Sequence, residues 1–276
     1  MGTNIKKELL RFISEDVQSG DITSVLLPKK KIKAKIISRQ EGILAGIRFA
    51  KDIFYLKGCR VRIIKKDGVK LKPNQIILQV SGDAKAVLSC ERTVLNLLAR
   101  MSGIATQTSL LVSKIRKINR KTKLYSTRKT APGLRFFDKE AVVIGGGHKH
   151  RMSLNDMVMI KDNHLLVSNS IENITKNARR QHKDVEVEVE NQRDAMIAAS
   201  SGATIVMLDN FSPAQIKKTI SALQKKKLRN KVKLEASGGI NSKNIAAYAK
   251  TGVDMISVGS ITNSVKSLDL SLEVCV

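Results

Sequence analysis

The 276-residue sequence contains no tryptophan, and aromatic residues make up only 3% of it. Few rings are therefore available for stacking on single-stranded nucleic acid. No apolar run approaches the roughly 18–20 residues that a bilayer-spanning helix needs. The opening segment, MGTNIKKELLRFISEDVQSGD, is charged throughout and lacks the uninterrupted apolar centre of a secretion signal. We therefore expect a cytoplasmic protein with no membrane partner.

Cysteine is scarce as well. The three cysteines, an odd number, are Cys59, Cys90 and Cys275. They lie far apart and form no C-x-x-C pair. This pattern is not that of a disulfide framework, and it predicts reduced thiols in a cytosolic compartment.

Acidic residues are outnumbered by basic ones, 24 against 50, which gives a formal net charge of +26. Such a charge attracts polyanions, so a nucleic-acid-binding protein is one hypothesis. Many lysines, however, stand in runs such as KKKIKAK and QKKKLRNKVK, which are typical of solvated surfaces. We keep nucleic-acid binding as an alternative and do not expect it to be the main function.

The first part of the chain has short segments of mixed type. Apolar residues at helical spacing predict a helix over residues 4–18, and period-two patterning predicts strands in KIKAKIIS, CRVRIIKK and NQIILQV. The stretch from Ala84 to Ile118 predicts two helices, broken near Ser102-Gly103. We place an N-terminal domain at 1–104 and a second domain at 105–263, and we expect the tail 264–276 to pack on the first.

The second domain alternates apolar runs with helical spacers. The candidate strands are KLYST (123–127), AVVI (141–144), MVMI (157–160), VEVEV (185–189), TIVML (204–208), VKLEA (232–236) and MISVG (255–259). Seven short runs with helices between them predict a parallel sheet. Because no glycine-rich dinucleotide loop follows the first run, an α/β barrel is favoured over a nucleotide-binding open sheet.

Polar residues follow these runs, where the active site of a β/α barrel lies. Six runs end in charged, polar or glycine-rich groups, among them Arg128, Lys129, Lys161, Glu188, Asp209 and Ser237-Gly238-Gly239. Any one of them could be a loop residue or a helix cap. Six at one end of the sheet favour a functional face.

Two glycine-bearing loops, SGGI after the sixth run and GSIT after the seventh, occupy positions where barrels commonly bind phosphate through backbone N–H groups. A lone Gly-Gly could equally serve a tight turn. Together, the loops predict a phosphate site.

The segment GGGHKHR (145–151) allows two interpretations. His148 and His150 would share one face of an extended chain, as a two-ligand metal clip requires. Lys149 and Arg151 would repel a cation, however, and their side chains suit a carboxylate or phosphate. We therefore interpret the segment as part of an anion cradle.

Motifs along most of the chain resemble those of the quinolinate phosphoribosyltransferase family. They occur in the family's order from GDITS near residue 21 to the C-terminus, and they are ERTVLN, SGIAT, STRKTAPGLR, GGGHKHR, MIKDNH, VEVEVE, MLDNF, EASGGI and VGSIT. The combination of TRKTAPGLR, GGGHKHR and IKDNH is specific. A related branch found in molybdate-transport loci shares much of the barrel pattern, but the Lys-Asp-Asn-His segment favours the quinolinate enzymes.

The resemblance implies an N-terminal α/β sandwich domain and an incomplete, seven-stranded (β/α) barrel, assembled as a homodimer or larger oligomer. It implies a pentosyltransferase of NAD biosynthesis that converts quinolinate and phosphoribosyl pyrophosphate to nicotinate mononucleotide, pyrophosphate and CO2, with Mg²⁺.

The resemblance also implies roles for individual residues. Catalytic roles fall to Lys129, Lys161, Glu188 and Asp209, and the last two are also implied to hold Mg²⁺, directly or indirectly. The implied substrate-binding residues are these four with Arg92, Thr127, Arg128, His150, Arg151, Ser237, Gly238, Gly239, Val258, Gly259 and Ser260. Arg92 is implied to complete the neighbouring subunit's site. Asn263 stands where the family often has histidine, which puts a phosphate contact there in doubt.

Overall fold

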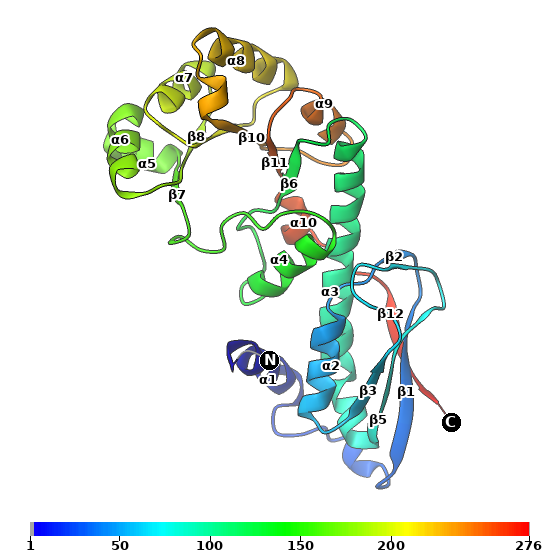
Figure 1. Cartoon of the computed structure of the whole chain (residues 1–276). Helices are drawn as coiled ribbons and strands as arrows, with labels where there is room; N and C mark the ends of the chain where they lie inside the picture. The colour runs from blue at the N-terminus through cyan, green and yellow to red at the C-terminus, as the bar shows by residue number, and fades with distance from the viewer. Residues whose placement is uncertain (1–2, 276) are drawn as a thin grey trace. The chain divides into compact units, whose positions relative to one another are not determined.

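A computed structural model describes residues 3–275 and divides into two compact units (Figure 1). The first unit runs to Gln107 and takes in Val143–Gly145 and the segment from Val265; the second comprises Thr108–Val142 and Gly146–Ser264. Both units are therefore discontinuous in sequence. No helix in the described part of the chain combines the length and apolarity needed to cross a membrane.

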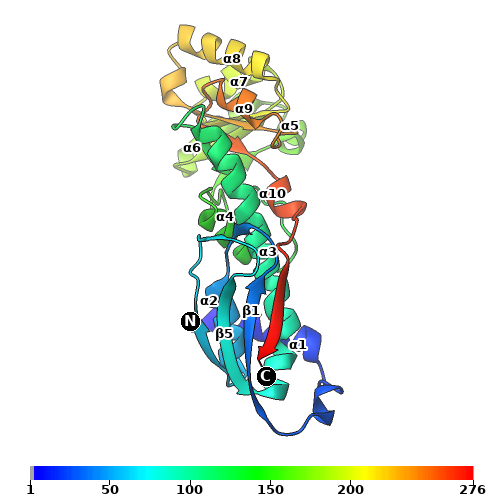
Figure 2. The ribbon, with the colours of Figure 1, turned by 90° about the vertical axis from the view of Figure 1, so that its right-hand side faces the viewer.

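The first unit is built on an antiparallel sheet with strand order β12-β1-β5-β3. Its strands are β1 (Lys31–Ser38), β3 (Arg60–Ile63), β5 (Ile76–Asp83) and β12 (Leu270–Cys275). The strands β1 and β3 fall in segments that the period-two pattern predicts, and β5 begins in the third such segment and runs three residues past its end. β12 lies antiparallel to β1, from Cys275 opposite Lys33 to Leu270 opposite Ser38 (Figure 2).

Helices α1 (Thr3–Val17) and α2 (Ile47–Leu56) complete this unit with the short pair β2 (Gly42–Ile43) and β4 (Lys70–Leu71) and the 3-10 turn η1 (Ser24–Leu26). The predicted apolar face of α1 buries Leu9 and Ile13, and α2 buries Ile53 and Phe54. The helices thus supply apolar side chains to the core of the unit.

Helix α3 (Ala84–Arg116) is a single helix. The predicted break near Ser102-Gly103 is wrong, because neighbouring segments require small residues there. A Cβ atom at Gly103 would lie 2.2 Å from the carbonyl oxygen of Lys266, and Ser102 Oγ accepts a hydrogen bond from the Ala45 N–H at 3.0 Å. The Ser-Gly pair allows close packing inside a helix and does not end it.

The second unit is built on a parallel sheet with strand order β6-β11-β10-β9-β8-β7. The strands are β6 (Lys123–Tyr125), β7 (Val158–Ile160), β8 (Val185–Val189), β9 (Ile205–Asp209), β10 (Lys233–Ser237) and β11 (Met255–Ser257). Each coincides with a predicted run or begins or ends within a few residues of it. The strands bury mostly apolar residues, as in a sheet that is covered on both faces, with buried glutamates in β8 and β10 as exceptions.

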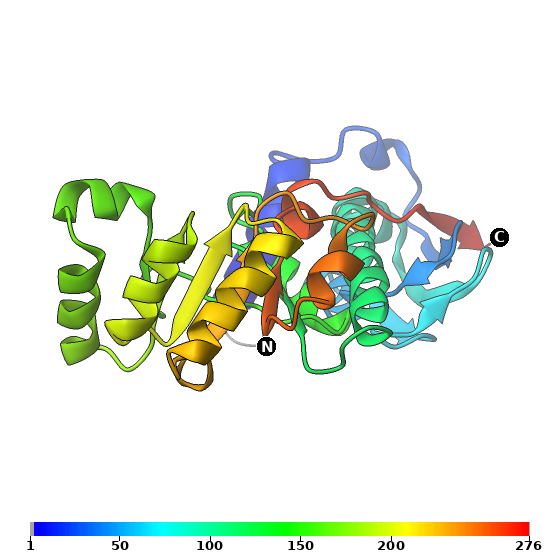
Figure 3. The same cartoon turned by 90° about the horizontal axis from the view of Figure 1, so that it is seen from above.

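The helices of this unit are α4 (Arg135–Ile144), α5 (Asp162–Ser168), α6 (Ile171–Gln181), α7 (Gln192–Ser200), α8 (Pro213–Lys225), α9 (Ile245–Ala249) and α10 (Ser260–Asn263), with the 3-10 turn η2 (Arg229–Lys231). Helices α6, α7 and α8 follow one another along the sheet (Figures 1 and 3). Asn191 and Ser212 cap α7 and α8 by accepting hydrogen bonds from backbone N–H groups of the first turn.

The predicted strand AVVI is instead the end of α4. This helix buries Phe137 and, four and five residues later, Ala141 and Val142. A short apolar run alone does not distinguish a strand from a buried helix. The sheet therefore has six strands, and a few residues after α4 His148 adds an isolated parallel bridge to Tyr125 of the edge strand β6. Within residues 3–275, β7 pairs only with β8, so the barrel is incomplete.

Candidate active site

A cavity of about 350 Å³ opens at the carboxyl ends of the parallel strands. Nine of the predicted site residues line it: Thr127, Arg128, Lys129, His150, Arg151, Lys161, Glu188, Asp209 and Ser237. The same wall includes Ser126, Met159, Met207, Glu235 and Ser257. Groups from five strands, from the loop after β6 and from the loop before β7 therefore meet in one place.

The loop after β6 carries Arg128 and Lys129. Thr262 Oγ donates a hydrogen bond to the Lys129 carbonyl at 2.8 Å, and the Lys129 N–H donates to Thr127 Oγ at 3.1 Å. Arg128 Nε is buried and makes no hydrogen bond within the described residues. A buried donor without a partner costs free energy, which an anionic ligand in the cavity would recover.

Arg151 is held by its outer nitrogens, one 3.3 Å from the Met157 carbonyl and one 3.1 Å from Met159 Sδ. Burial and then the neighbouring Arg128 lower the pKa of Arg151, while the negative charges of carboxylates on Glu186, Glu188 and Asp156 oppose the shift. Two guanidinium groups close enough to repel each other make this wall attractive to an anion.

Lys161 and Glu188 form an ion pair, with Nζ 2.5 Å from Oε2. Lys161 is the N-cap of α5, and its N–H donates to Nδ1 of His164 at 3.0 Å. The histidine of the IKDNH motif therefore fixes the backbone from which the lysine projects.

Asp209 ends β9, and its Oδ2 accepts a hydrogen bond from Asn210 Nδ2 at 2.6 Å. Asn210 adopts a left-handed backbone conformation with φ +56°. Its side chain lies so close to Gly238 that a Cβ atom there would be 2.1 Å from Asn210 Oδ1. The first glycine of SGGI is thus needed for packing against Asn210.

The other predicted phosphate residues lie in loops after β10 and β11. Gly239 also has a left-handed conformation, with φ +60°. Val258 is buried, and its N–H bonds to the Tyr125 carbonyl at 3.0 Å, whereas Gly259 and Ser260 begin α10. A Cβ atom at Gly259 would lie 3.1 Å from Lys129 Cδ, so this loop touches a cavity residue although it does not line the cavity.

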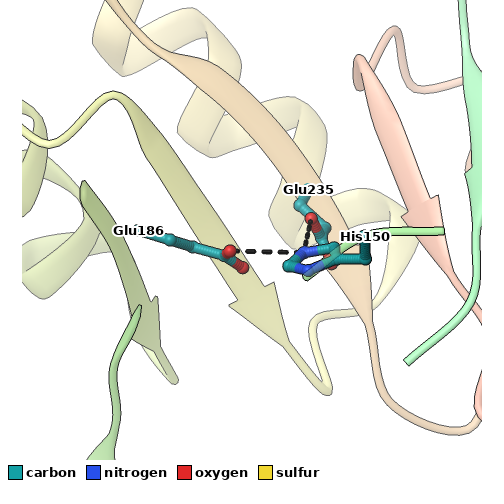
Figure 4. A group of neighbouring side chains, drawn as sticks. All are labelled: His150, Glu186 and Glu235. Atoms are coloured by element: carbon teal, nitrogen blue, oxygen red, sulfur yellow. Dashed lines mark hydrogen bonds and ion pairs between the residues drawn. The ribbon is translucent and has the colours of Figure 1, made fainter. Parts of the chain in front are cut away.

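His150 lies between two buried glutamates that sequence reasoning missed (Figure 4). Its Nε2 is 3.2 Å from Glu186 Oε2 and 3.3 Å from Glu235 Oε2, and both carboxylates are fully buried. Glu235 is also bonded to the Ser257 hydroxyl. The signal was available in VEVEV and VKLEA, because a carboxylate inside a buried strand requires a partner.

The pKa of His150 reflects opposing effects. Burial lowers the pKa, but the hydrogen bonds and negative charges of Glu186 and Glu235 outweigh burial and raise the pKa to about 9. Burial and the charge of Glu235 raise the pKa of Glu186. His150 and Glu186 therefore both hold protons more tightly than they would separately in water.

The atoms of His150, Glu186 and Glu235 lie within 4.8 Å of one another, as metal ligands can. In the neutral imidazole, His150 Nδ1 accepts a hydrogen bond from the backbone N–H of Arg151 at 2.8 Å, so the remaining ring proton is on Nε2. A metal would need that nitrogen unprotonated. The cluster is therefore better suited to sharing protons than to holding a metal.

The two-histidine clip considered for GGGHKHR does not form. His150 has φ +54°, not an extended backbone, and the exposed His148 stacks on Tyr125 at 4.9 Å. Lys149 pairs with Glu140 and does not line the cavity. Of Lys149 and Arg151, only Arg151 therefore joins the anion-binding wall.

Glu188 and Asp209 suit the Mg²⁺ that the resemblance implies. Carboxylate oxygens are the ligands that Mg²⁺ prefers, and the two residues lie on neighbouring strands. Within residues 3–275, Glu188 Oε1 and Asp209 Oδ1 accept no hydrogen bond, so each offers an oxygen.

Arg92 is not among the residues lining this cavity. It is an exposed residue of α3 in the first unit. Its participation in a neighbouring subunit's site remains a prediction.

Both parts of the chain match known family models: residues 21–102 match the quinolinate phosphoribosyl transferase N-terminal domain, and residues 104–273 match the C-terminal domain. A probable nicotinate-nucleotide pyrophosphorylase [carboxylating] of Archaeoglobus fulgidus is 44% identical and covers 92% of this chain and 98% of the relative. A probable nicotinate-nucleotide pyrophosphorylase [carboxylating] of Bacillus subtilis is 41% identical, and the match covers 98% of this chain and 93% of the relative. The solved nicotinate-nucleotide pyrophosphorylase of Francisella tularensis matches with TM-score 0.92 and 39% identity, covering 100% of this chain and 98% of the other. The chain belongs to the quinolinate phosphoribosyltransferase family.

Proposed function

We propose that this chain transfers the phosphoribosyl group of phosphoribosyl pyrophosphate to quinolinate, with loss of CO2. The products are nicotinate mononucleotide, a precursor of NAD, and pyrophosphate. The observation that carries the proposal is that Arg128, Arg151 and Lys161 line one cavity with Glu188 and Asp209.

Both substrates are anions, one a pyridine dicarboxylate and the other a sugar that bears phosphate and pyrophosphate. Bringing them together requires cations that offset their mutual repulsion, and these act most strongly where water is limited. Arg128 and Arg151 offer planar donor groups that match carboxylates, and Lys129 and Lys161 offer compact charges.

Departure of pyrophosphate leaves positive charge on the ribose C1. Glu188 and Asp209 are placed to stabilise this charge, directly or through the ribose hydroxyls. The pyridine nitrogen donates its electron pair to C1, the C1–pyrophosphate bond breaks, and the ring nitrogen becomes cationic. Holding the two reactants in line is the main contribution of the site.

Decarboxylation follows from the cationic ring. The C2–carboxylate bond breaks with release of CO2, and its electron pair remains at C2 next to the positive nitrogen. A proton taken up at C2 completes nicotinate mononucleotide. No covalent link to the protein is required.

We further propose that Ser237–Gly239 and Val258–Ser260 hold the 5′-phosphate and that Glu188 and Asp209 hold Mg²⁺, which would offset charge on the pyrophosphate. Arg92 would reach the site of a second subunit in a homodimer or larger oligomer. We expect a cytoplasmic location, and the three unpaired cysteines support a reducing compartment.

The deciding experiment incubates the purified chain with quinolinate, phosphoribosyl pyrophosphate and Mg²⁺, and measures nicotinate mononucleotide and CO2 in equal amounts. Nicotinate in place of quinolinate should give no CO2 and little product. Transfer without CO2 release would instead support a different phosphoribosyl transfer, such as that of the molybdate-associated branch. Steeply salt-dependent RNA or DNA binding, without either activity, would support the nucleic-acid alternative.

A further inference from the structure

Lys139 is a lysine with no solvent exposure, in the middle of α4. It does not line the cavity, and neither the anion cradle nor the proposed chemistry uses it. Lysine is almost never fully buried unless its ammonium has partners. Its partners therefore indicate what it does.

The ammonium of Lys139 donates to two backbone carbonyls, that of Lys149 and, at 2.6 Å, that of Arg151. These carbonyls lie on either side of His150. Ser126 Oγ adds a third contact to this segment by donating to the Lys149 carbonyl at 2.9 Å. The backbone around His150 is thus tied to α4 and to the end of β6.

The held segment has an unfavourable conformation. His150 has φ +54°, which side chains of this size adopt rarely and at a cost in free energy. This conformation places the imidazole against Glu186 and Glu235, while Arg151 reaches the cavity wall. A segment that is free to relax would lose both placements.

The position is also an unfavourable one for a cation. Burial lowers the pKa of Lys139 to about 8; Arg135 adds to the effect, Asp156 opposes it, and Arg128 and Arg151 lower it further. An apolar side chain would avoid this penalty. The lysine is best explained by the two carbonyls that its ammonium holds.

We propose that Lys139 is a positioning residue, which fixes the backbone on both sides of His150 and thereby aims His150 and Arg151 at the substrate. Lys139 acts through these residues and touches no reactant. This inference rests on the proposed function for the identity of the ligand, because Arg151 would then contact quinolinate.

The test replaces Lys139 by methionine, which has similar length and no donor. Calorimetric titration with quinolinate should show at least a tenfold weaker Kd at unchanged stoichiometry, with a matching rise in KM for quinolinate. KM for phosphoribosyl pyrophosphate should stay within twofold. The control is Lys149→Met, the same substitution in the held segment. It should leave the Kd for quinolinate and the KM values for both substrates within twofold of wild type.

A purely structural role gives a different result. Lys139→Met would then lower the stoichiometry and kcat through loss of folded protein, with the Kd for quinolinate unchanged, and the proposal would be wrong. If Lys139→Met does not fold, Lys139→Gln is tested instead, because glutamine keeps a donor but is shorter than lysine. An intermediate loss of affinity for quinolinate supports the proposal, and wild-type affinity for quinolinate overturns it.

Failure of the proposed function would appear separately, as a wild-type chain that does not bind quinolinate. Hydrogen–deuterium exchange of the 147–151 backbone then tests Lys139 without a ligand. The comparison uses whichever Lys139 variant folds, Lys139→Met or Lys139→Gln. Exchange at least tenfold faster than in the wild type in that variant, with no such increase in Lys149→Met, supports the proposal. Unchanged exchange in that variant overturns it.

Discussion

Lys161 Nζ lies 2.5 Å from Glu188 Oε2, which joins a cation after β7 to a carboxylate on β8 at the wall of one cavity. The lysine is 39% exposed and the glutamate 14%, so water reaches the pair mainly from the lysine side. We expect an incoming anion to compete with Glu188 for Lys161. The carboxylate would then face the ribose carbon just as positive charge develops there.

Replacing Lys161 by alanine should lower kcat/KM by about 100- to 1,000-fold, the usual effect of removing one well-placed electrostatic contact. Thermal unfolding should change little, because the pair is partly exposed. Steady-state kinetics and circular dichroism measure the two effects. The control is Lys225→Ala at the end of the surface helix α8; activity of Lys161→Ala equal to that of this control would remove Lys161 from the site.

Replacing Arg128 by alanine should abolish tight binding of quinolinate, because its buried Nε has no partner within the described residues. Arg128→Lys should recover little, since lysine cannot present the same planar pair of donors. Calorimetric titration measures the affinity. Full rescue by lysine would mean that only the charge at this position matters.

Protomers with Arg92→Ala, mixed with protomers with Lys161→Ala, should regain activity if sites are shared between subunits. Each hybrid dimer would contain one intact site, so random exchange should restore about one quarter of wild-type activity. Size-exclusion chromatography with distinct tags verifies the exchange. No recovery in verified hybrids would place Arg92 outside the site.

The stability of the chain should fall as pH rises toward 9. The pKa of His150 is raised in the folded state to about 9, above the ordinary 6.5, so its protonation stabilises the fold fully below pH 6.5 and this contribution is lost by about pH 9. The loss is on the order of 1–3 kcal/mol. Urea unfolding of wild type and His150→Gln at several pH values isolates it; parallel curves would contradict the shift.

His148 provides a matched comparison. Burial, then Lys123 and Arg116, lower its pKa, so its cost to stability appears only at low pH and is absent above 6.5. His148→Gln should therefore track wild type between pH 6.5 and 9.

Removing Mg²⁺ with a chelator should abolish turnover, and adding Mg²⁺ should restore it. Asp209→Asn should require a higher Mg²⁺ concentration for half-maximal rate, because an amide oxygen binds the ion more weakly than a carboxylate. Activity that survives chelation would show that the carboxylates act on the ribose without the ion.

Much of the second unit could be predicted from sequence. Six strands were found because parallel strands are buried on both faces, which produces short apolar runs. The same rule misplaced AVVI, since the end of a partly buried helix can have the same composition. The break predicted at Gly103 was wrong because the carbonyl oxygen of Lys266, far away in sequence, is what requires a glycine there.

The site was predictable to the extent that its residues follow strands. Arg128, Lys161 and Asp209 come directly after apolar runs, and the direction of parallel strands brings them together. Glu186, Glu235 and Lys139 were missed because they lie inside a strand or helix, where the pattern predicts only packing. The glutamates contact His150 from distant parts of the sequence, and even the nearer partners of Lys139 are backbone carbonyls, which no sequence pattern marks.

Strand β12 lies beside β1 and is formed by the last described residues of the chain. A fragment ending near residue 104 would keep β1 but lose this neighbour, leaving a row of unsatisfied backbone groups open to pairing with other molecules. Anyone wishing to study the amino-terminal half in isolation should therefore expect precipitation, unless the final strand is grafted back on.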